Sequence, residues 1–188
     1  MHEHVTDTAL AAAFERHARS RPEQAATAAL FSRLLESPDD PFRRSRLDGH
    51  FTSSAWLVDR SGTRALLTHH RKLGIWVQPG GHADGDRDLC AVALREAGEE
   101  SGLAGLRVEP DIFDLDRHWI PEHKGVPGHW HYDARYVVHA GADEAFVVSE
   151  ESHALEWRSI RAIAADAGAD ASLRRMARRW LSLRQDQG

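Results

Sequence analysis

Residues 80–103 read GGHADGDRDLCAVALREAGEESGL, and this stretch decides the fold. Apolar and acidic side chains recur through it at the three- and four-residue intervals that place them on one face of a helix. The members of that stripe are Leu89, Val92, Ala93, Glu96, Glu99, Glu100 and Leu103. The spacing predicts a helix over residues 88–101, which Gly102 ends.

Three carboxylates, those of Glu96, Glu99 and Glu100, continue a stripe whose apolar members predict an inward-facing side. Acidic residues are seldom buried unless they are paired or bound to a metal, because desolvating a carboxylate costs several kcal/mol. A bound divalent cation would satisfy all three, and an all-oxygen ligand set favours Mg²⁺ or Mn²⁺ over Zn²⁺. The alternative is a solvated acidic face paired with Arg95.

Two glycines precede this helix, and one of them begins a motif that resembles a family signature. Gly80 and Gly81 allow the backbone to approach a phosphate or a metal closely, which makes Gly81 a candidate metal contact. From Gly81 onward the chain resembles the Nudix signature G-x5-E-x7-R-E-U-x-E-E-x-G-U, in which U is an aliphatic residue. Every fixed position matches except the first glutamate, where Arg87 stands, and Ala97 is a small occupant of an aliphatic site.

The resemblance to the Nudix hydrolase (MutT-like) family covers about residues 50–160. It implies an α/β fold, an α/β/α sandwich with a mixed β-sheet, and a metal held on the loop and helix. It also implies that Glu99 and Glu100 are the main metal ligands, that Glu96 shares in metal binding, and that Arg95 orients glutamates. The candidate catalytic residues are therefore Arg95, Glu96, Glu99 and Glu100, and the candidate metal contacts are Gly81, Glu96, Glu99 and Glu100.

The activity implied is cleavage of a diphosphate linkage in a nucleoside diphosphate derivative or a nucleoside triphosphate, by Mg²⁺-dependent attack of water on phosphorus, with Mn²⁺ as an alternative metal. Arg87 stands where the family's first glutamate supports the metal site, and Asp86 or Asp88 substitutes for it if the loop shifts by one residue. A non-catalytic nucleotide sensor or interaction protein is the alternative. An isomerase of isopentenyl diphosphate is disfavoured, because Cys90 lies within the helix.

The signature leaves the general base and the recognition of a nucleobase open. In the family the base lies in the signature helix or in a later loop, where Glu150 and Glu151 are candidates and a plain acidic turn is the alternative. Trp76, Trp119 and Trp130 could stack on a base, and each serves equally well as a core residue.

Several of the 13 histidines cluster in the sequence. His129, His131 and Asp133 alternate toward the same face of a predicted strand. Such a row could contact substrate phosphate, bind a transition metal or serve a structural role. The candidate substrate-binding residues are His82, His118, His129, His131 and Arg71.

The rest of the chain predicts helices around a sheet. Residues 1–47 are expected to form an N-terminal helical extension, with helices over residues 8–20 and 22–36, and residues 48–188 the Nudix domain with a C-terminal helix. Strands are expected at residues 51–59, 64–69, 75–78, 106–116, 130–140, 145–148 and 155–157, with a long polar connection at residues 118–129.

Composition sets the broad class. The 188 residues suffice for one well-buried domain with a modest extension. No apolar run approaches the roughly 20 residues that a membrane span requires. The net charge of −5 comes without a long basic block, so no stable nucleic-acid partner is expected. The single cysteine, Cys90, excludes an internal disulfide and gives no sign of an oxidising compartment, so a cytoplasmic protein is expected. The family resemblance implies a small-molecule nucleotide or diphosphate substrate and a possible homodimer.

Overall fold

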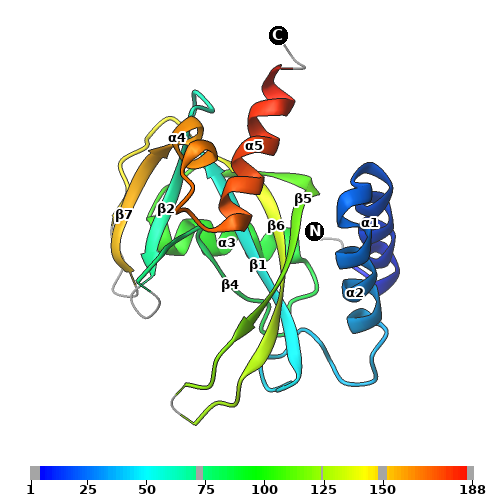
Figure 1. The fold of residues 1–188 in the computed structure, drawn as a ribbon. Helices are drawn as coiled ribbons and strands as arrows, with labels where there is room; N and C mark the ends of the chain where they lie inside the picture. The colour runs from blue at the N-terminus through cyan, green and yellow to red at the C-terminus, as the bar shows by residue number, and fades with distance from the viewer. Residues whose placement is uncertain (1–4, 71–73, 124, 148–151, 186–188) are drawn as a thin grey trace.

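A mixed β-sheet lies at the centre of the computed structural model, which describes residues 5–70, 74–123, 125–147 and 152–185 (Figure 1). Its strands within those residues are β1 (Gly49–Val58), β2 (Arg64–His70), β3 (Trp76–Val77), β4 (Gly80–His82), β5 (Arg107–Ile120), β6 (His129–His139) and β7 (Ser152–Ser159). The order is β3-β2-β1-β6-β5, while β4 pairs with β1 and β7 pairs with β2. The β1 and β6 strands are parallel, and the other pairs are antiparallel.

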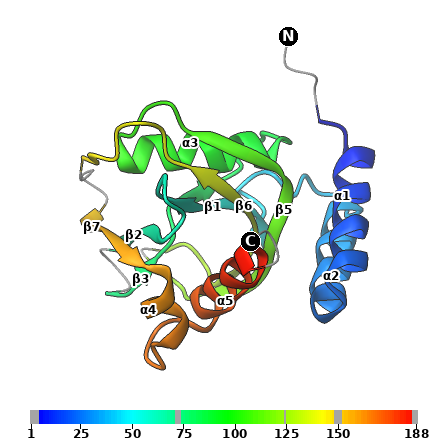
Figure 2. The ribbon, with the colours of Figure 1, turned by 90° about the horizontal axis from the view of Figure 1, so that it is seen from above.

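Helices cover both faces of this sheet. They are α1 (Asp7–Ser20), a 3₁₀ turn (Pro22–Gln24), α2 (Ala25–Leu35), α3 (Leu89–Ser101), α4 (Ile160–Ala165) and α5 (Ala171–Gln185). Figure 2 shows α3 on one side of the strands, α4 and α5 on the other, and α1 and α2 beside β5. This is the predicted α/β/α sandwich. Within the described residues, no helix has both the length and the apolar character to cross a membrane.

The β1 strand shows why the core has two layers. All ten of its residues are buried, because helices cover the sheet on both sides. Ala55 and Leu57 pack in the apolar cluster that includes Ala97 of α3, whereas Trp56 and Val58 pack in the cluster that includes residues of α4 and α5. Successive side chains of a strand point to opposite faces, so the alternation assigns each β1 residue to a layer.

The N-terminal helices share the core of the sheet. The rings of Phe14 in α1 and Phe31 in α2 lie 6.0 and 5.8 Å from the ring of Phe51 in β1, and both side chains are fully buried. Aromatic contacts of this kind bury a large apolar area. The division of the chain into an extension of residues 1–47 and a domain of residues 48–188 stays a prediction.

Three expected elements differ in the structure. The β5–β6 pairing continues to Ile120 opposite His129, which shortens the connection expected at residues 118–129 to residues 121–128. Residues 145–147 are not a strand, because the Val147 N–H donates to the Ser101 carbonyl at the end of α3, and residue 148 lies outside the described residues. Pro22 begins the 3₁₀ turn before α2.

Candidate active site

The α3 helix carries the signature residues and has well-defined ends. The Asp88 carboxylate accepts a hydrogen bond from the Ala91 N–H at 2.9 Å, which caps the first turn. Gly102 takes a left-handed conformation with φ 68° and ends the helix, as predicted. These two residues set where α3 begins and ends.

The buried face of α3 differs from the predicted one. Its buried residues are Leu89, Val92, Ala93, Ala97 and Ser101. The side chain of Glu99 is 66% exposed, whereas that of Glu96 is only 17% exposed. Because a helix turns by about 100° per residue, Ala97 and Ser101 continue the row from Leu89 and leave the glutamates at its border. The expectation that all three carboxylates face inward is therefore wrong for Glu99.

The glycine loop and the helix hold two of these carboxylates against the backbone. A Cβ atom at Gly81 would lie 2.3 Å from the Glu96 Oε2 atom, so only glycine allows Glu96 to sit this close to the chain. The Gly80 N–H donates to Glu100 Oε1 at 2.9 Å. Gly81 pairs with Ser53 of β1, which fixes the loop to the central sheet. The structure thus brings Gly81, Glu96 and Glu100 together at the glycine loop, whereas the exposed side chain of Glu99 lies outside these contacts.

Arg95 lies among the acidic side chains. Its guanidinium donates to Glu96 Oε1 at 3.1 Å and to the His82 carbonyl at 3.4 Å. It also lies 4.0 Å from Glu99 and 3.7 Å from Asp86. This position suits the orienting role predicted for Arg95, which stays a prediction.

The carboxylate cluster fits a divalent cation. Burial raises the pKa of Glu96, although the hydrogen bond and charge of Arg95 oppose the rise. A buried carboxylate with a raised pKa gains from a nearby cation. Carboxylate oxygens are the ligands that Mg²⁺ and Mn²⁺ prefer, so Glu96, Glu99 and Glu100 could hold either ion.

The four predicted histidines lie close together. His82 is on β4, His118 on β5, and His129 and His131 on β6. The ring of His131 lies 5.0 Å from His82, 5.5 Å from His118 and 5.1 Å from His129. The remaining candidates, Arg71, Glu150 and Glu151, lie outside the described residues.

A fifth histidine, His50, was not predicted from the sequence. It stands at the start of β1, and the parallel register with β6 places it directly opposite His131. Its ring lies 5.0 Å from the rings of both His129 and His131. Only knowledge of this pairing between distant strands could have found it.

Burial keeps two of these rings uncharged. It lowers the pKa of His82 to about 4, with the Arg44 charge adding to the shift, and the pKa of His131 to about 2, with the neighbouring histidines adding to it. Both imidazoles are therefore neutral at neutral pH and offer no positive charge to a phosphate. The substrate-binding role of His82, His118, His129 and His131 stays a prediction.

The glutamates and the histidines lie on opposite faces of β4. Gly81 and His82 are neighbours on this strand, so they face opposite sides of the sheet. Gly81 faces Glu96 of α3. The His82 ring lies beside His50 and His131 on the other side. The two clusters are adjacent along the chain but separated by the sheet.

A buried ionic network extends from the histidines toward α5, and sequence reasoning missed it. Arg135 is 3% exposed and lies 2.8 Å from Asp133, 3.3 Å from Asp114 and 3.2 Å from Asp116. Arg175 of α5 adds a second cation, 2.7 Å from Asp114. Burial alone would raise the pKa of Asp116, but His118, Arg135 and Arg175 outweigh it and hold that pKa well below its usual range.

Most of the chain matches one known protein family. The family model described as the NUDIX domain matches residues 49–180, which is most of the chain. The chain belongs to the Nudix hydrolase (MutT-like) family. The predicted family and the predicted class of enzyme, a Nudix-type pyrophosphohydrolase, are thereby confirmed.

Solved structures share the fold of this Nudix hydrolase. The MutT protein from Methanosarcina mazei Go1 is 20% identical with a TM-score of 0.58, covering 74% of this chain and 98% of that chain. A C. elegans Ap4A hydrolase in a binary complex is 18% identical with a TM-score of 0.56, covering 72% and 98%. The E. coli dihydroneopterin triphosphate pyrophosphohydrolase is 17% identical with a TM-score of 0.56, covering 71% and 95%. No curated protein matches this chain in sequence.

The departure from the Nudix signature at Arg87 has a structural explanation. The Arg87 guanidinium pairs with Asp7 of α1 and lies 4.7 Å over the ring of Phe42. Of the two aspartates considered as substitutes, Asp88 caps α3, whereas Asp86 lies 3.7 Å from Arg95. Asp86 thus provides an acidic partner for Arg95.

Arg87→Ala is expected to leave kcat/KM within about threefold of the wild-type value and to lower the free energy of unfolding by at most about 1 kcal/mol. The Asp7 pair that it removes is partly exposed on both sides. Asp86→Asn is expected to lower kcat/KM more, because it removes a partner of Arg95. Steady-state kcat/KM values of the two variants test this. A larger loss of kcat/KM in Arg87→Ala than in Asp86→Asn would contradict the assignment of Asp86 as the partner of Arg95.

Gly81→Ala is expected to lower kcat by about 100-fold, because the new methyl group must displace the Glu96 carboxylate. Gly98→Ala in α3 is the matched control, since the nearest atom to its Cβ is 4.0 Å away. The control should keep full activity and gain about 0.5–1 kcal/mol of helix stability. Rates and thermal unfolding of both variants test this, and equal activity in the two would exclude a role for the close approach at Gly81.

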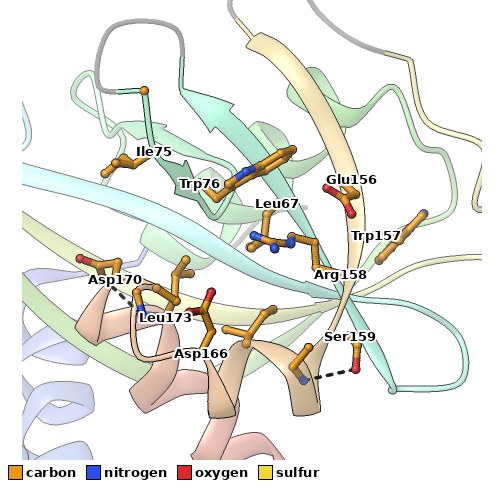
Figure 3. Close-up of a pocket in the computed structure, with 15 residues that line it drawn as sticks. Leu67, Ile75, Trp76, Glu156, Trp157, Arg158, Ser159, Asp166, Asp170 and Leu173 are labelled. Carbon is orange, nitrogen blue, oxygen red and sulfur yellow. Dashed lines mark hydrogen bonds between the residues drawn. The ribbon is translucent and has the colours of Figure 1, made fainter.

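A cavity of about 590 Å³ opens between the sheet and the C-terminal helices of this Nudix hydrolase (Figure 3). Residues of β2, β3, β7, α4 and α5 line it. The Arg158 guanidinium lies 5.4 Å over the ring of Trp76 at its wall. Sites for small ligands commonly have volumes in this range and combine an aromatic surface with a few polar groups.

Proposed function

We propose that this Nudix hydrolase cleaves a diphosphate linkage in a nucleoside diphosphate derivative or a nucleoside triphosphate, with Mg²⁺ as its metal and Mn²⁺ as an alternative. The observation that carries this proposal is the close approach of Glu96 to Gly81, beside the Gly80 N–H that donates to Glu100. It gathers carboxylates and a glycine loop at one place, as binding of a metal and a diphosphate requires.

Each residue of the carboxylate cluster has a distinct role in the proposed reaction. Glu96, Glu99 and Glu100 supply oxygen ligands, and Arg95 holds the Glu96 carboxylate in place. When bound, Mg²⁺ supplies positive charge that offsets the phosphate oxygens and acidifies the attacking water. Water attacks phosphorus in line, the bridging P–O bond breaks, and the water's protons pass to a carboxylate and to solvent. The products are two phosphate esters, or a nucleotide and pyrophosphate.

The cavity beside Trp76 is proposed to take the rest of the substrate. Trp76 and Gly80 are four residues apart, which spans at most about 14 Å of chain. A base stacked on the Trp76 ring would lie on the α4 and α5 side of the sheet, so the diphosphate would have to reach around the sheet to the carboxylates on the α3 side. The C. elegans and E. coli neighbours are named for Ap4A and dihydroneopterin triphosphate, which supports a small-molecule polyphosphate substrate. The cytoplasmic location and the homodimer stay predictions.

A panel of nucleoside triphosphates and nucleoside diphosphate derivatives, incubated with Mg²⁺ or Mn²⁺ and analysed for both products, tests the proposal. We expect turnover of at least one class, complete loss on chelation, and a product pair that identifies the bond cleaved. Nucleotide binding with no turnover of any member would contradict it. That outcome would favour the alternative of a non-catalytic nucleotide sensor.

A further inference from the structure

Four histidine rings from three neighbouring strands gather on the sheet face opposite α3. The ring centroids of His50, His82 and His131 lie 5.0 to 5.2 Å apart in all three pairs. One ligand nitrogen of each of these three lies within 4.8 Å of the other two. His129 adjoins them, with its Nε2 atom 3.2 Å from the Nε2 atom of His131.

Contacts with backbone carbonyls determine which ring nitrogen of His50 and His129 donates a hydrogen bond. The Nδ1 atom of His50 lies 3.1 Å from the Arg46 carbonyl, and that of His129 lies 2.8 Å from the Pro127 carbonyl. Since a carbonyl only accepts, the Nδ1 atom of each ring donates, and in the neutral tautomer that this contact selects Nε2 carries the lone pair. Histidines that bind metals are typically held in this way, with the other ring nitrogen donating to a carbonyl or carboxylate.

Among the described residues, the His50 ring presents an unpaired acceptor to the neighbouring histidines. The side chain is 1% exposed, and its Nε2 atom is buried with no hydrogen-bond partner among the described residues. The centroid of the His50 ring lies 5.2, 5.0 and 5.0 Å from the ring centroids of His82, His129 and His131. An unsatisfied buried acceptor costs about 1–3 kcal/mol, and a cation among these rings would remove that cost.

We propose that His50, His82 and His131 bind one Zn²⁺ ion, with His129 beside the fourth coordination position. Imidazole nitrogens suit Zn²⁺, whereas Mg²⁺ prefers oxygen ligands. Zinc–nitrogen bonds of about 2.0–2.1 Å place tetrahedral ligands about 3.3 Å apart. The ligand nitrogens of the three rings lie within 4.8 Å of one another, and those of His129 and His131 lie 3.2 Å apart. The site lies across β4 from the glutamates and does not depend on the proposed hydrolysis.

Titration of ZnCl₂ into the chelator-treated full chain, in excess Mg²⁺ and followed by calorimetry, tests this site. We expect one Zn²⁺ per chain, and an affinity more than about 100-fold weaker in His50→Gln and His131→Asn, beyond the loss that outer contacts usually cause. His139→Asn is the matched control, because His139 lies on the same strand but bonds only to Glu109 among its described side-chain hydrogen bonds. It should bind Zn²⁺ as the wild type does.

Two further measurements separate the possible failures. Co²⁺ bound to the wild-type chain should give the intense visible absorption of a four-coordinate site, which decides the matter even if a histidine variant does not fold. The variant with Glu96, Glu99 and Glu100 all changed to glutamine should keep its Zn²⁺ affinity, whatever its activity. No stoichiometric Zn²⁺ in the wild type, a six-coordinate Co²⁺ spectrum, or unchanged affinity in folded His131→Asn would overturn the proposal.

Discussion

Glu100→Gln is expected to lower kcat/KM at least about 100-fold while the protein stays folded. Glutamine keeps an oxygen that can accept from the Gly80 N–H, which lies 2.9 Å from Glu100 Oε1, but it removes the charge that a divalent cation needs. Losing a contact outside the ligand shell of a metal already costs about 10–100-fold, so losing a ligand should cost more. Glu99→Gln should behave alike, and its 66% exposed side chain makes an effect on folding small.

Initial rates with Mg²⁺ on these two variants, together with their thermal unfolding, give the measurement. Glu15→Gln is the control, because Glu15 is an exposed carboxylate on α1 whose ion-pair partner is Arg19. Its rate should equal that of the wild type. If Glu99→Gln and Glu100→Gln both stayed within about threefold of the control, the carboxylates would not be the metal ligands of the reaction.

Arg135→Met is expected to lower the free energy of unfolding by about 3–5 kcal/mol, because it leaves buried carboxylates without their central cation. Arg135 is 3% exposed, and Asp133 and Asp114, two of its partners, are 5% and 2% exposed. Methionine fills a similar apolar volume, so the loss reports mainly the charge. This is the largest effect on stability that we expect from one change in the described residues.

Urea unfolding at neutral pH measures this loss, with Arg19→Met as the control for an exposed pair worth at most about 0.5 kcal/mol. Adding Asp133→Asn to Arg135→Met should restore part of the stability. The pKa of Asp116 is depressed in the fold, so its contribution is present above the unfolded value of about 4 and is lost as the pH falls. The deficit of Arg135→Met should therefore shrink in acid, and a deficit below about 1 kcal/mol at neutral pH would contradict the account.

The sequence predicted the parts of the site that lie close together along the chain. The glycine loop, α3 and its end at Gly102 follow from local spacing and backbone preference. The approach of Glu96 to Gly81 follows from them once β4 is paired with β1. The exposure of Glu99 could not be predicted, since a stripe defined by three- and four-residue steps does not say which edge of it the sheet covers.

Contacts between distant strands could not be read from local patterns. His50 joins the other histidines only through the parallel register of β1 with β6. The sequence pattern groups Asp133 with His129 and His131 but does not predict its pairing with Arg135, and the burial of Arg135 and Asp114 depends on how α5 packs on the sheet. Arg87 departs from the Nudix signature and pairs with Asp7, which lies 80 residues earlier in the chain, so its partner could not be found from the local pattern.

The most direct test of the central claim is hydrolysis in ¹⁸O-enriched water with the best substrate of the panel, followed by the mass of each product. Attack of water on phosphorus at the carboxylate cluster predicts one ¹⁸O atom on one phosphate product per turnover with Mg²⁺. It predicts no labelled product after chelation, and labelled product formed at least about 100-fold more slowly by the Glu100→Gln variant. Labelled product formed equally fast by Glu100→Gln, or none formed by the wild type while nucleotide binds, would contradict the claim.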